Sequence, residues 1–78
     1  MNTTWAGSRY RTTAVRDNAE GCAGLRLHEE VNGSESVVAE VIFWDASGQF
    51  YVQTMTREVP LDIIEALIAE AKAYVHVR

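Results

Sequence analysis

The sequence predicts an α+β fold: an antiparallel meander of about four strands with one C-terminal helix packed on one face, in the order ββββα. Two runs rich in β-branched and aromatic residues, from Glu35 to Asp45 and from Gln49 to Thr56, flank a tight turn and predict a hairpin. An amphipathic segment follows directly, from Pro60 to about Val75, and predicts a helix. This order determines the architecture and does not by itself specify a reaction.

Size and composition restrict the chain to one domain. Its 78 residues are too few to divide between two cores, so residues 1–78 are predicted to fold as a single unit. Hydrophobic residues make up 47% and charged residues 23% of the sequence, a balance typical of globular proteins. A domain of this size hides only about 60% of its unfolded surface, so burial against a partner subunit would add stability.

The first half of the chain predicts two strands after a loose arm. Residues 1–7 hold few apolar residues besides Trp5 and form the arm. The threonines, tyrosine and valine between Ser8 and Arg16 favour a strand, and Asp17 to Gly21 supplies loop residues. From Cys22 to Val31 apolar and polar residues alternate, which predicts a half-buried strand.

The next turn is predicted at Asn32-Gly33, because both residues accept the positive φ of a type I′ turn. A two-residue turn opposes Leu27 to Val38 and Leu25 to Glu40. This register puts the Glu40 carboxylate on the apolar side of the sheet, where it needs a partner or a raised pKa. Three explanations stay open: a different register, a position at the sheet margin, or a small pocket that Glu40 lines.

A three-residue loop is predicted within Asp45 to Gly48, and it opposes Trp44 to Phe50 and Ile42 to Val52. The two hairpins together define two sheet faces. The more apolar face is predicted to take the helix and holds Leu25, Leu27, Val38, Ile42, Trp44, Phe50 and Val52. The second face holds Arg26, His28, Val37, Ala39, Val41, Phe43, Tyr51, Gln53 and Met55.

The predicted helix is amphipathic, and Pro60 suits its first turn. Its apolar stripe consists of Ile64, Leu67, Ile68, Ala71, Tyr74 and Val75. A single helix of about fifteen residues, roughly 22 Å long, covers one face of a four-stranded sheet and leaves the other face exposed.

The uncovered second face is the predicted functional surface, because an exposed patch of this composition marks an association site. Its predicted binding residues are Val41, Phe43, Tyr51, Gln53, Met55, Arg26 and His28. We expect a homodimer, formed either sheet face to sheet face or through an edge strand. The alternative is that the arm with Trp5, or the first strand, folds over this face within one subunit.

No pattern in the sequence predicts catalytic residues, a metal site or a cofactor. His28 and Glu30 share one side of a strand, and two ligands do not make a metal site. Cys22 follows a loop glycine with no helix N-terminus beside it in sequence, so an unreactive thiol is expected. A different class of function is a small-molecule binding protein or enzyme with a pocket between subunits around Glu40, Trp44 and Tyr51.

Charge and compartment limit the partners. The chain up to His28 has four arginines against two acids, whereas from Glu29 onward nine acids face three bases. The arginines could attract single-stranded nucleic acid, but the net charge of −4 disfavours this partner. The lone Cys22 and the absence of a signal-peptide pattern predict a cytoplasmic protein, and no apolar run approaches the about eighteen residues of a membrane span.

Three segments of the second half carry a resemblance. They are Phe43 to Phe50, Val59 to Leu61, and Leu67 to Lys72. This pattern, over roughly the last 40 residues, resembles small bacterial proteins carried on mobile integron gene cassettes. The resemblance implies a bacterial, cytoplasmic accessory protein that binds another protein, a small molecule or nucleic acid, and it brings no catalytic residues.

Overall fold

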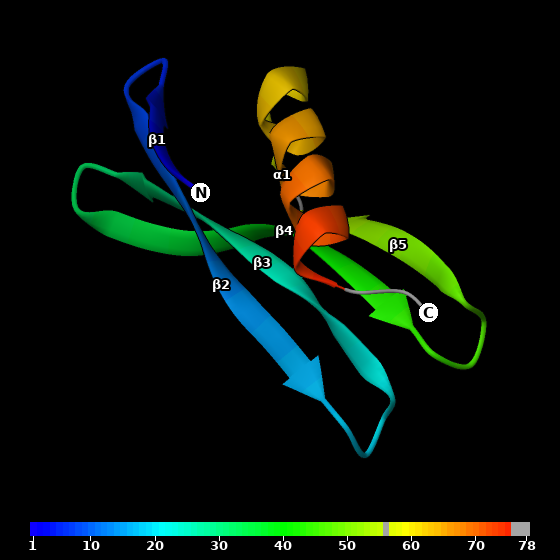
Figure 1. Cartoon of the computed structure of the whole chain (residues 1–78). Helices are drawn as coiled ribbons and strands as arrows, with labels where there is room; N and C mark the ends of the chain where they lie inside the picture. The colour runs from blue at the N-terminus through cyan, green and yellow to red at the C-terminus, as the bar shows by residue number, and fades with distance from the viewer. Residues whose placement is uncertain (56, 76–78) are drawn as a thin grey trace.

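The computed structural model describes residues 1–55 and 57–75 and shows an α+β fold: a five-stranded antiparallel meander followed by one helix (Figure 1). Neighbours in the sequence are neighbours in the sheet, in the order β1-β2-β3-β4-β5. The elements are β1 (Asn2–Trp5), β2 (Ser8–Asp17), β3 (Cys22–Val31), β4 (Ser34–Trp44), β5 (Gln49–Thr54) and α1 (Leu61–Tyr74). The predicted end of the last strand, Thr56, lies outside the described residues.

The first residues form a strand, so the prediction of a loose arm was wrong. β1 pairs with the start of β2, with Asn2 opposite Arg11 and Trp5 opposite Ser8. Ala6 and Gly7 make the turn between them with positive φ values of 49° and 83°. The sheet therefore has five strands, and β1 extends its edge instead of folding over the second face.

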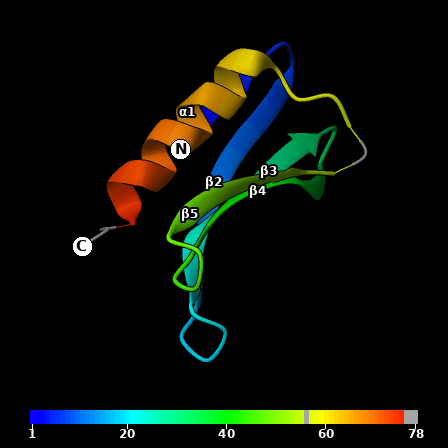
Figure 2. The same cartoon turned by 90° about the vertical axis from the view of Figure 1, so that its right-hand side faces the viewer.

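Helix α1 lies across one face of the sheet, against β3 and β4 (Figure 2). Leu67 and Leu27, from the helix and from β3, are both completely buried at this contact. The core consists of Tyr10, Leu25, Leu27, Val38, Ala39, Val41, Ile63, Leu67 and Ala71. Burying a side chain of this size contributes about 1.5–3 kcal/mol, so this layer supplies most of the folding energy.

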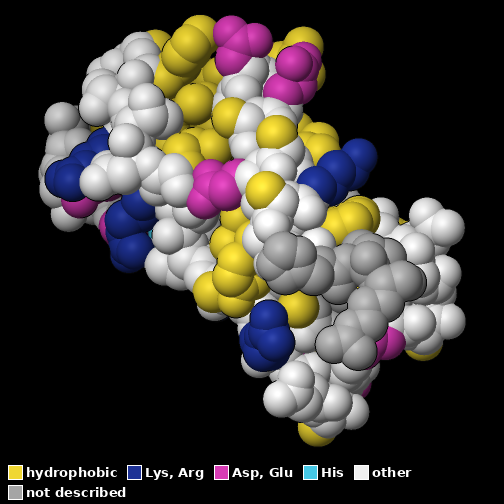
Figure 3. Space-filling model, viewed as in Figure 1, with side chains coloured by type: hydrophobic (Ala, Val, Ile, Leu, Met, Phe, Trp, Pro, Cys, Tyr) yellow, Lys and Arg dark blue, Asp and Glu magenta, His cyan; other side chains and the backbone are white. Residues whose placement is uncertain are grey.

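The helix packs against the sheet with nearly the predicted apolar stripe, but the buried side begins at Ile63 instead of Ile64. Ile63 is buried beside Leu67, while the predicted Tyr74 is exposed at the end of the helix. Seen from the helix side, apolar side chains lie along the flanks of α1 (Figure 3). In the part of the chain that the structure describes, no helix has the length and apolar character to cross a membrane.

A β-bulge in β4 changes the predicted register. Val31 pairs with Ser34 as predicted, but the register shifts between Leu27 and His28, so Leu27 opposes Ala39. Val38 is the extra residue, and its side chain is buried in the core. A shift of one residue reverses which side chains face the helix, and every β4 residue beyond the bulge is affected.

The last hairpin has a loop one residue longer than predicted. Residues 45–48 all lie in the loop, and the N–H of Gly48, at φ 66°, donates to the Trp44 carbonyl at 2.9 Å. Phe50 therefore opposes Phe43, and Tyr51 opposes Ile42. The assignment of Ile42 and Trp44 to the helix-covered face was wrong, because the bulge places them on the other side. The longer loop then keeps Phe50 and Val52 on the helix side, as predicted.

The open face of the sheet as a candidate interaction surface

The sheet face away from α1, called the open face below, holds the candidate site. The register places on it Arg11 and Thr13 from β2, Arg26 and His28 from β3, Glu35, Val37, Glu40, Ile42 and Trp44 from β4, and Tyr51 and Gln53 from β5. Charged pairs occupy the side near β2 and aromatic side chains occupy the side near β5. These two halves have different chemistry.

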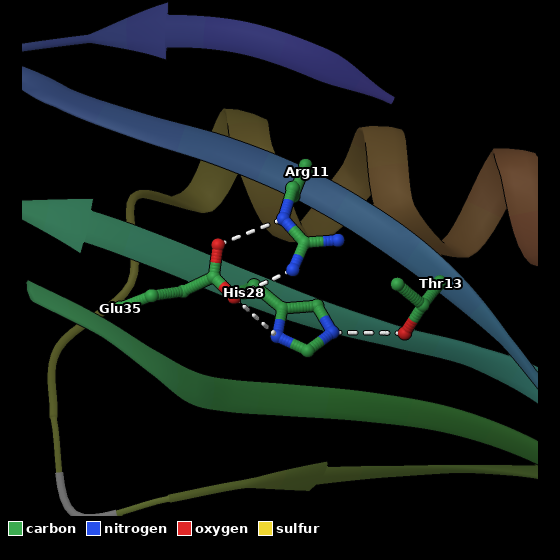
Figure 4. Close-up of polar contacts among 4 residues, drawn as sticks. All are labelled: Arg11, Thr13, His28 and Glu35. Atoms are coloured by element: carbon green, nitrogen blue, oxygen red, sulfur yellow. Dashed lines mark hydrogen bonds and ion pairs between the residues drawn. The ribbon is translucent and has the colours of Figure 1, made fainter.

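A polar cluster of four residues crosses three strands of the open face (Figure 4). Arg11 donates two hydrogen bonds to the Glu35 carboxylate, from Nε at 2.7 Å and from Nη2 at 2.5 Å. The His28 ring lies beside this pair, with Nδ1 3.6 Å from Glu35 Oε1 and Nε2 2.8 Å from Thr13 Oγ1. The cluster links β2, β3 and the start of β4.

The electrostatics of the cluster follow from the forked pairing. The hydrogen bonds from Arg11 hold the pKa of the Glu35 carboxyl below its usual value, and the same bonds raise the pKa of Arg11. Both charges therefore persist across the physiological pH range. Because both side chains are partly exposed to water, the pair fixes orientation more than it adds stability.

The order Thr13, His28, Glu35 has the connectivity of a hydroxyl, imidazole and carboxylate relay, and its geometry argues against catalysis. At 3.6 Å, Glu35 makes no hydrogen bond to the ring, and both of its oxygens accept from Arg11. A triad needs that bond to hold the imidazole in the required tautomer. Within residues 1–55 and 57–75, no group of three or more His, Cys, Asp and Glu side chains could hold a metal ion.

Glu40 lies on the open face, which resolves the question that its predicted position raised. The bulge at Val38 moves it away from the helix and opposite Arg26, and its Oε1 lies 3.4 Å from Arg26 Nε. A different register is therefore the explanation, and Glu40 does not line a pocket under the helix. The Arg26–Glu40 pair separates the polar cluster from the aromatic half of the face.

The aromatic half of the open face consists of Ile42 and Trp44 from β4 and Tyr51 from β5. Tyr51 lies directly opposite Ile42. Trp44 is 36% and Tyr51 is 53% exposed. A shallow hollow of about 320 Å³ lies here, lined by Trp44, Ala46, Ser47 and Tyr51. This aromatic patch, defined as Ile42, Trp44 and Tyr51, is the most apolar part of the open face.

The predicted binding residues divide between the two sides of the sheet. Arg26, His28, Tyr51 and Gln53 lie on the open face, as predicted for a surface. Val41 and Phe43 do not: Val41 is completely buried under α1, and Phe43 packs on Phe50 with ring centroids 5.0 Å apart. Met55 lies just past β5, half-buried, and its N–H donates to the Val38 carbonyl.

Three members of the polar cluster were missed by the sequence reasoning, namely Arg11, Thr13 and Glu35. The pairing of β2 with β3 brings Arg11 opposite His28, and His28 opposite Val37 brings Glu35 near. The predicted loop, Asp17 to Gly21, is one residue too long, and pairing across it sets Arg11 opposite Leu27 instead of His28. The observed loop begins after Asp17, so the predicted register could not bring the cluster together.

A second polar set lies on the helix side and ties distant segments together. Tyr10 Oη donates to Glu29 at 2.7 Å, and Arg57 Nη1 donates to the same carboxylate at 3.3 Å. On α1, Glu70 accepts hydrogen bonds from Thr12 Oγ1 at 2.7 Å and from the amino group of Met1 at 2.6 Å. These contacts hold β1 and β2 against the helix and support the fold.

Comparisons with known proteins show no relationship for this chain: no protein-family model matches it, and neither a curated protein nor a solved structure does. The resemblance to integron cassette proteins therefore stays a prediction.

Proposed function

We propose that this chain is a small protein-interaction module that forms a homodimer through the β5 side of its sheet. The observation that carries the proposal is the aromatic patch, where Trp44 and Tyr51 lie exposed on neighbouring strands of the uncovered face. In keeping with the cassette resemblance, we further propose an accessory role in the bacterial cytoplasm.

The kind of side chain exposed in the aromatic patch supports this proposal. Tryptophan and tyrosine bring large contact areas at low entropy cost, and they dominate the energetics of protein interfaces. Phe50, Phe43 and the core already occupy the helix side, so Trp44 and Tyr51 have no cover within the described chain. A domain of 78 residues also gains most from burial against a partner.

The charged half of the open face would determine how a partner is oriented. Arg11 with Glu35, and Arg26 with Glu40, place both charge signs on this face. Such pairs at an interface rim affect association rate and specificity more than affinity. Because both arginines are already paired with glutamates, the face offers little net positive charge to a nucleic-acid backbone.

The proposal is tested by sedimentation velocity of the full chain at micromolar concentrations. We expect a species of twice the 8.7 kDa chain mass. Trp44→Ser should weaken the dimer by roughly thirtyfold, the loss typical of an aromatic hot spot of about 2 kcal/mol. The matched control is Trp5→Ser, since Trp5 is 43% exposed on β1, at the other edge of the sheet.

A second candidate function is small-molecule binding at the subunit junction. The hollow of about 320 Å³ beside Trp44 and Tyr51 favours it, since a second subunit would enclose this space. Thermal-shift screening of metabolites against the wild type and Trp44→Ser tests this. A ligand at a hundred times its Kd should add about 2.7 kcal/mol of stability to the wild type alone.

A further inference from the structure

Strand β5 exposes apolar side chains on both of its faces. Tyr51 is 53% exposed on the open face, and Val52 is 47% exposed on the helix side, where it opposes the buried Val41. Helix α1 packs over β3 and β4 and leaves Val52 uncovered. A partner stacked on the open face would cover Tyr51 only, whereas a neighbour along the strand edge contacts both side chains.

Among residues 1–55 and 57–75, no strand pairs with the outer edge of β5, so this edge presents free backbone groups. The sheet ends at β5 (Figure 1). The N–H of Met55 donates inward to the Val38 carbonyl. In an antiparallel pair, alternate residues direct their N–H and C=O groups to the partner strand. The backbones of Gln53 and Tyr51 therefore point toward β4, and those of Phe50, Val52 and Thr54 point outward.

Nothing in the sequence of β5 protects this edge from pairing. The strand reads Gln49–Thr54, QFYVQT, without charge, proline or glycine, and it is rich in residues that favour strands. Natural sheet edges are normally guarded by charges, prolines or short strands. The opposite edge follows that rule, because β1 has four residues and the free end of β2 carries Arg16 and Asp17.

We propose that β5 of a second copy of this chain pairs antiparallel with β5, which joins the two sheets into one. This inference rests on the proposed homodimer and specifies its geometry. The two-fold axis stands perpendicular to the sheet at Val52, because this register uses all the outward-facing residues: Val52 opposes its own counterpart, and Phe50 of each copy opposes Thr54 of the other.

The proposed pairing accounts for both exposed side chains. The two Val52 side chains meet on the helix side, between the two helices, and each Tyr51 lies beside Gln53 of the other copy on the open face. The two aromatic patches then flank the junction on the same face of the joined sheet. A strand of six residues gives an interface at the small end of the range, where weak and transient associations are typical, and we expect a Kd on the order of micromolar.

Disulfide trapping tests the geometry directly. Val52→Cys is introduced with Cys22→Ser, so that each chain has one thiol, and the protein is oxidised with diamide at about tenfold above the dimer Kd. Directly opposed residues of an antiparallel pair lie about 5.5 Å apart at Cα, inside the disulfide range of about 4.4–6.8 Å. We expect efficient covalent dimer formation. The matched control is Gln49→Cys on the same exposed strand, which should cross-link poorly because its counterpart lies far along the edge.

A second variant measures the contribution of this edge in solution. Val52→Lys keeps the half-exposed side chain on the surface of the monomer but places two positive charges on the two-fold axis. We expect at least a tenfold loss of dimer affinity by sedimentation, with an unchanged far-ultraviolet circular dichroism spectrum.

The outcomes separate the two proposals. If the wild-type chain sediments as a monomer at concentrations up to about ten times a micromolar Kd, both the proposed homodimer and its edge geometry are overturned. A wild-type dimer that Trp44→Ser dissociates, but that tolerates Val52→Lys and does not cross-link through Val52→Cys, keeps the interaction module and overturns the edge geometry. Cross-linking through Val52→Cys, together with dissociation by Val52→Lys, supports the joined sheet.

Discussion

Gly24 lies on β3 where the backbone of β4 approaches closely. A Cβ atom there would overlap the Val41 carbonyl oxygen and lie 2.9 Å from the Ile42 Cα. We expect Gly24→Ala to lower the free energy of unfolding by about 3 kcal/mol, because the clash is with backbone that cannot rotate away. Urea denaturation measures this loss.

The control for this prediction is Gly33→Ala. Gly33 lies in the open turn after Asn32 with no atom near its missing Cβ, so only its positive φ of 80° opposes the change. The expected loss is about 1 kcal/mol. Equal losses for the two variants would show that close strand approach is not what requires a glycine at position 24.

Glu29 is one of the carboxylates that make folding sensitive to acid. The hydrogen bond from Tyr10, aided by Arg57, lowers the pKa of Glu29 below 4.5 although burial acts to raise it. A carboxylate with a lowered pKa in the folded state stabilises the fold above its unfolded pKa, and this stabilisation is lost as pH falls through the folded pKa. We expect the urea concentration at the unfolding midpoint to decrease as the pH is lowered below about 4.5. In Tyr10→Phe this decrease with pH should be smaller.

The flattening should be partial, because Glu35 and Glu70 also have a lowered pKa in the fold. For Glu70, burial raises the pKa, and the bonds from the Met1 amino group and Thr12 outweigh it. Tyr51→Phe is the control, since the Tyr51 side chain is exposed on the open face. An unchanged pH slope in Tyr10→Phe would contradict the role given to the Tyr10–Glu29 bond.

At the scale of the elements, α1 stabilises the sheet through one side of its surface. Leu67 is completely buried against β3 and β4, whereas Leu61 at the helix start is 70% exposed. We expect Leu67→Ala to cost about 2–5 kcal/mol, since it removes a packed side chain and leaves a cavity. Leu61→Ala should change the free energy of unfolding by less than about 0.5 kcal/mol. Thermal unfolding of the two variants and of the wild type measures both changes in stability. Similar losses for the two variants would contradict the prediction.

Local sequence predicts where most of these elements begin and end. The strand Cys22–Val31 has the predicted bounds, because strict alternation and the Asn32-Gly33 turn are local features. The helix was predicted from Pro60 and begins one residue later, at Leu61, with Pro60 as its N-cap. β1 was missed because its turn, Ala6-Gly7, places an alanine at positive φ, which the residue type does not indicate.

The side of the sheet on which a residue lies depends on how many residues each bulge and loop contains. Local sequence does not show these numbers. The bulge at Val38 and the four-residue loop each shift the count by one, and each shift exchanges the two faces. Trp44 was therefore predicted under the helix and lies on the open face, and Val41 shows the reverse. One clue was available in the sequence. The predicted register left the Glu40 carboxylate without a partner, and a shift of one residue places it opposite Arg26.

At the scale of the whole molecule, the meander uses its two faces differently. One face, under α1, holds the core, and the other holds charged pairs beside an aromatic patch. Because the strands run in sequence order, the last strand is left at the edge of the sheet, next to that patch. The strand that lacks protection and the residues that lack cover are therefore neighbours, which is the arrangement expected of a self-associating domain.

Stability should consequently depend on protein concentration. If the dimer forms as proposed, each tenfold increase in concentration above the Kd adds about 1.4 kcal/mol per mole of dimer to the apparent free energy of unfolding. We expect the wild-type urea midpoint to rise with concentration over about two decades around micromolar. Val52→Lys and Trp44→Ser should move this rise to concentrations at least tenfold higher, and Trp5→Ser should follow the wild type. A wild-type midpoint independent of concentration over this range would mean that the exposed patch and edge remain in water, and that the chain folds without the partner proposed for it.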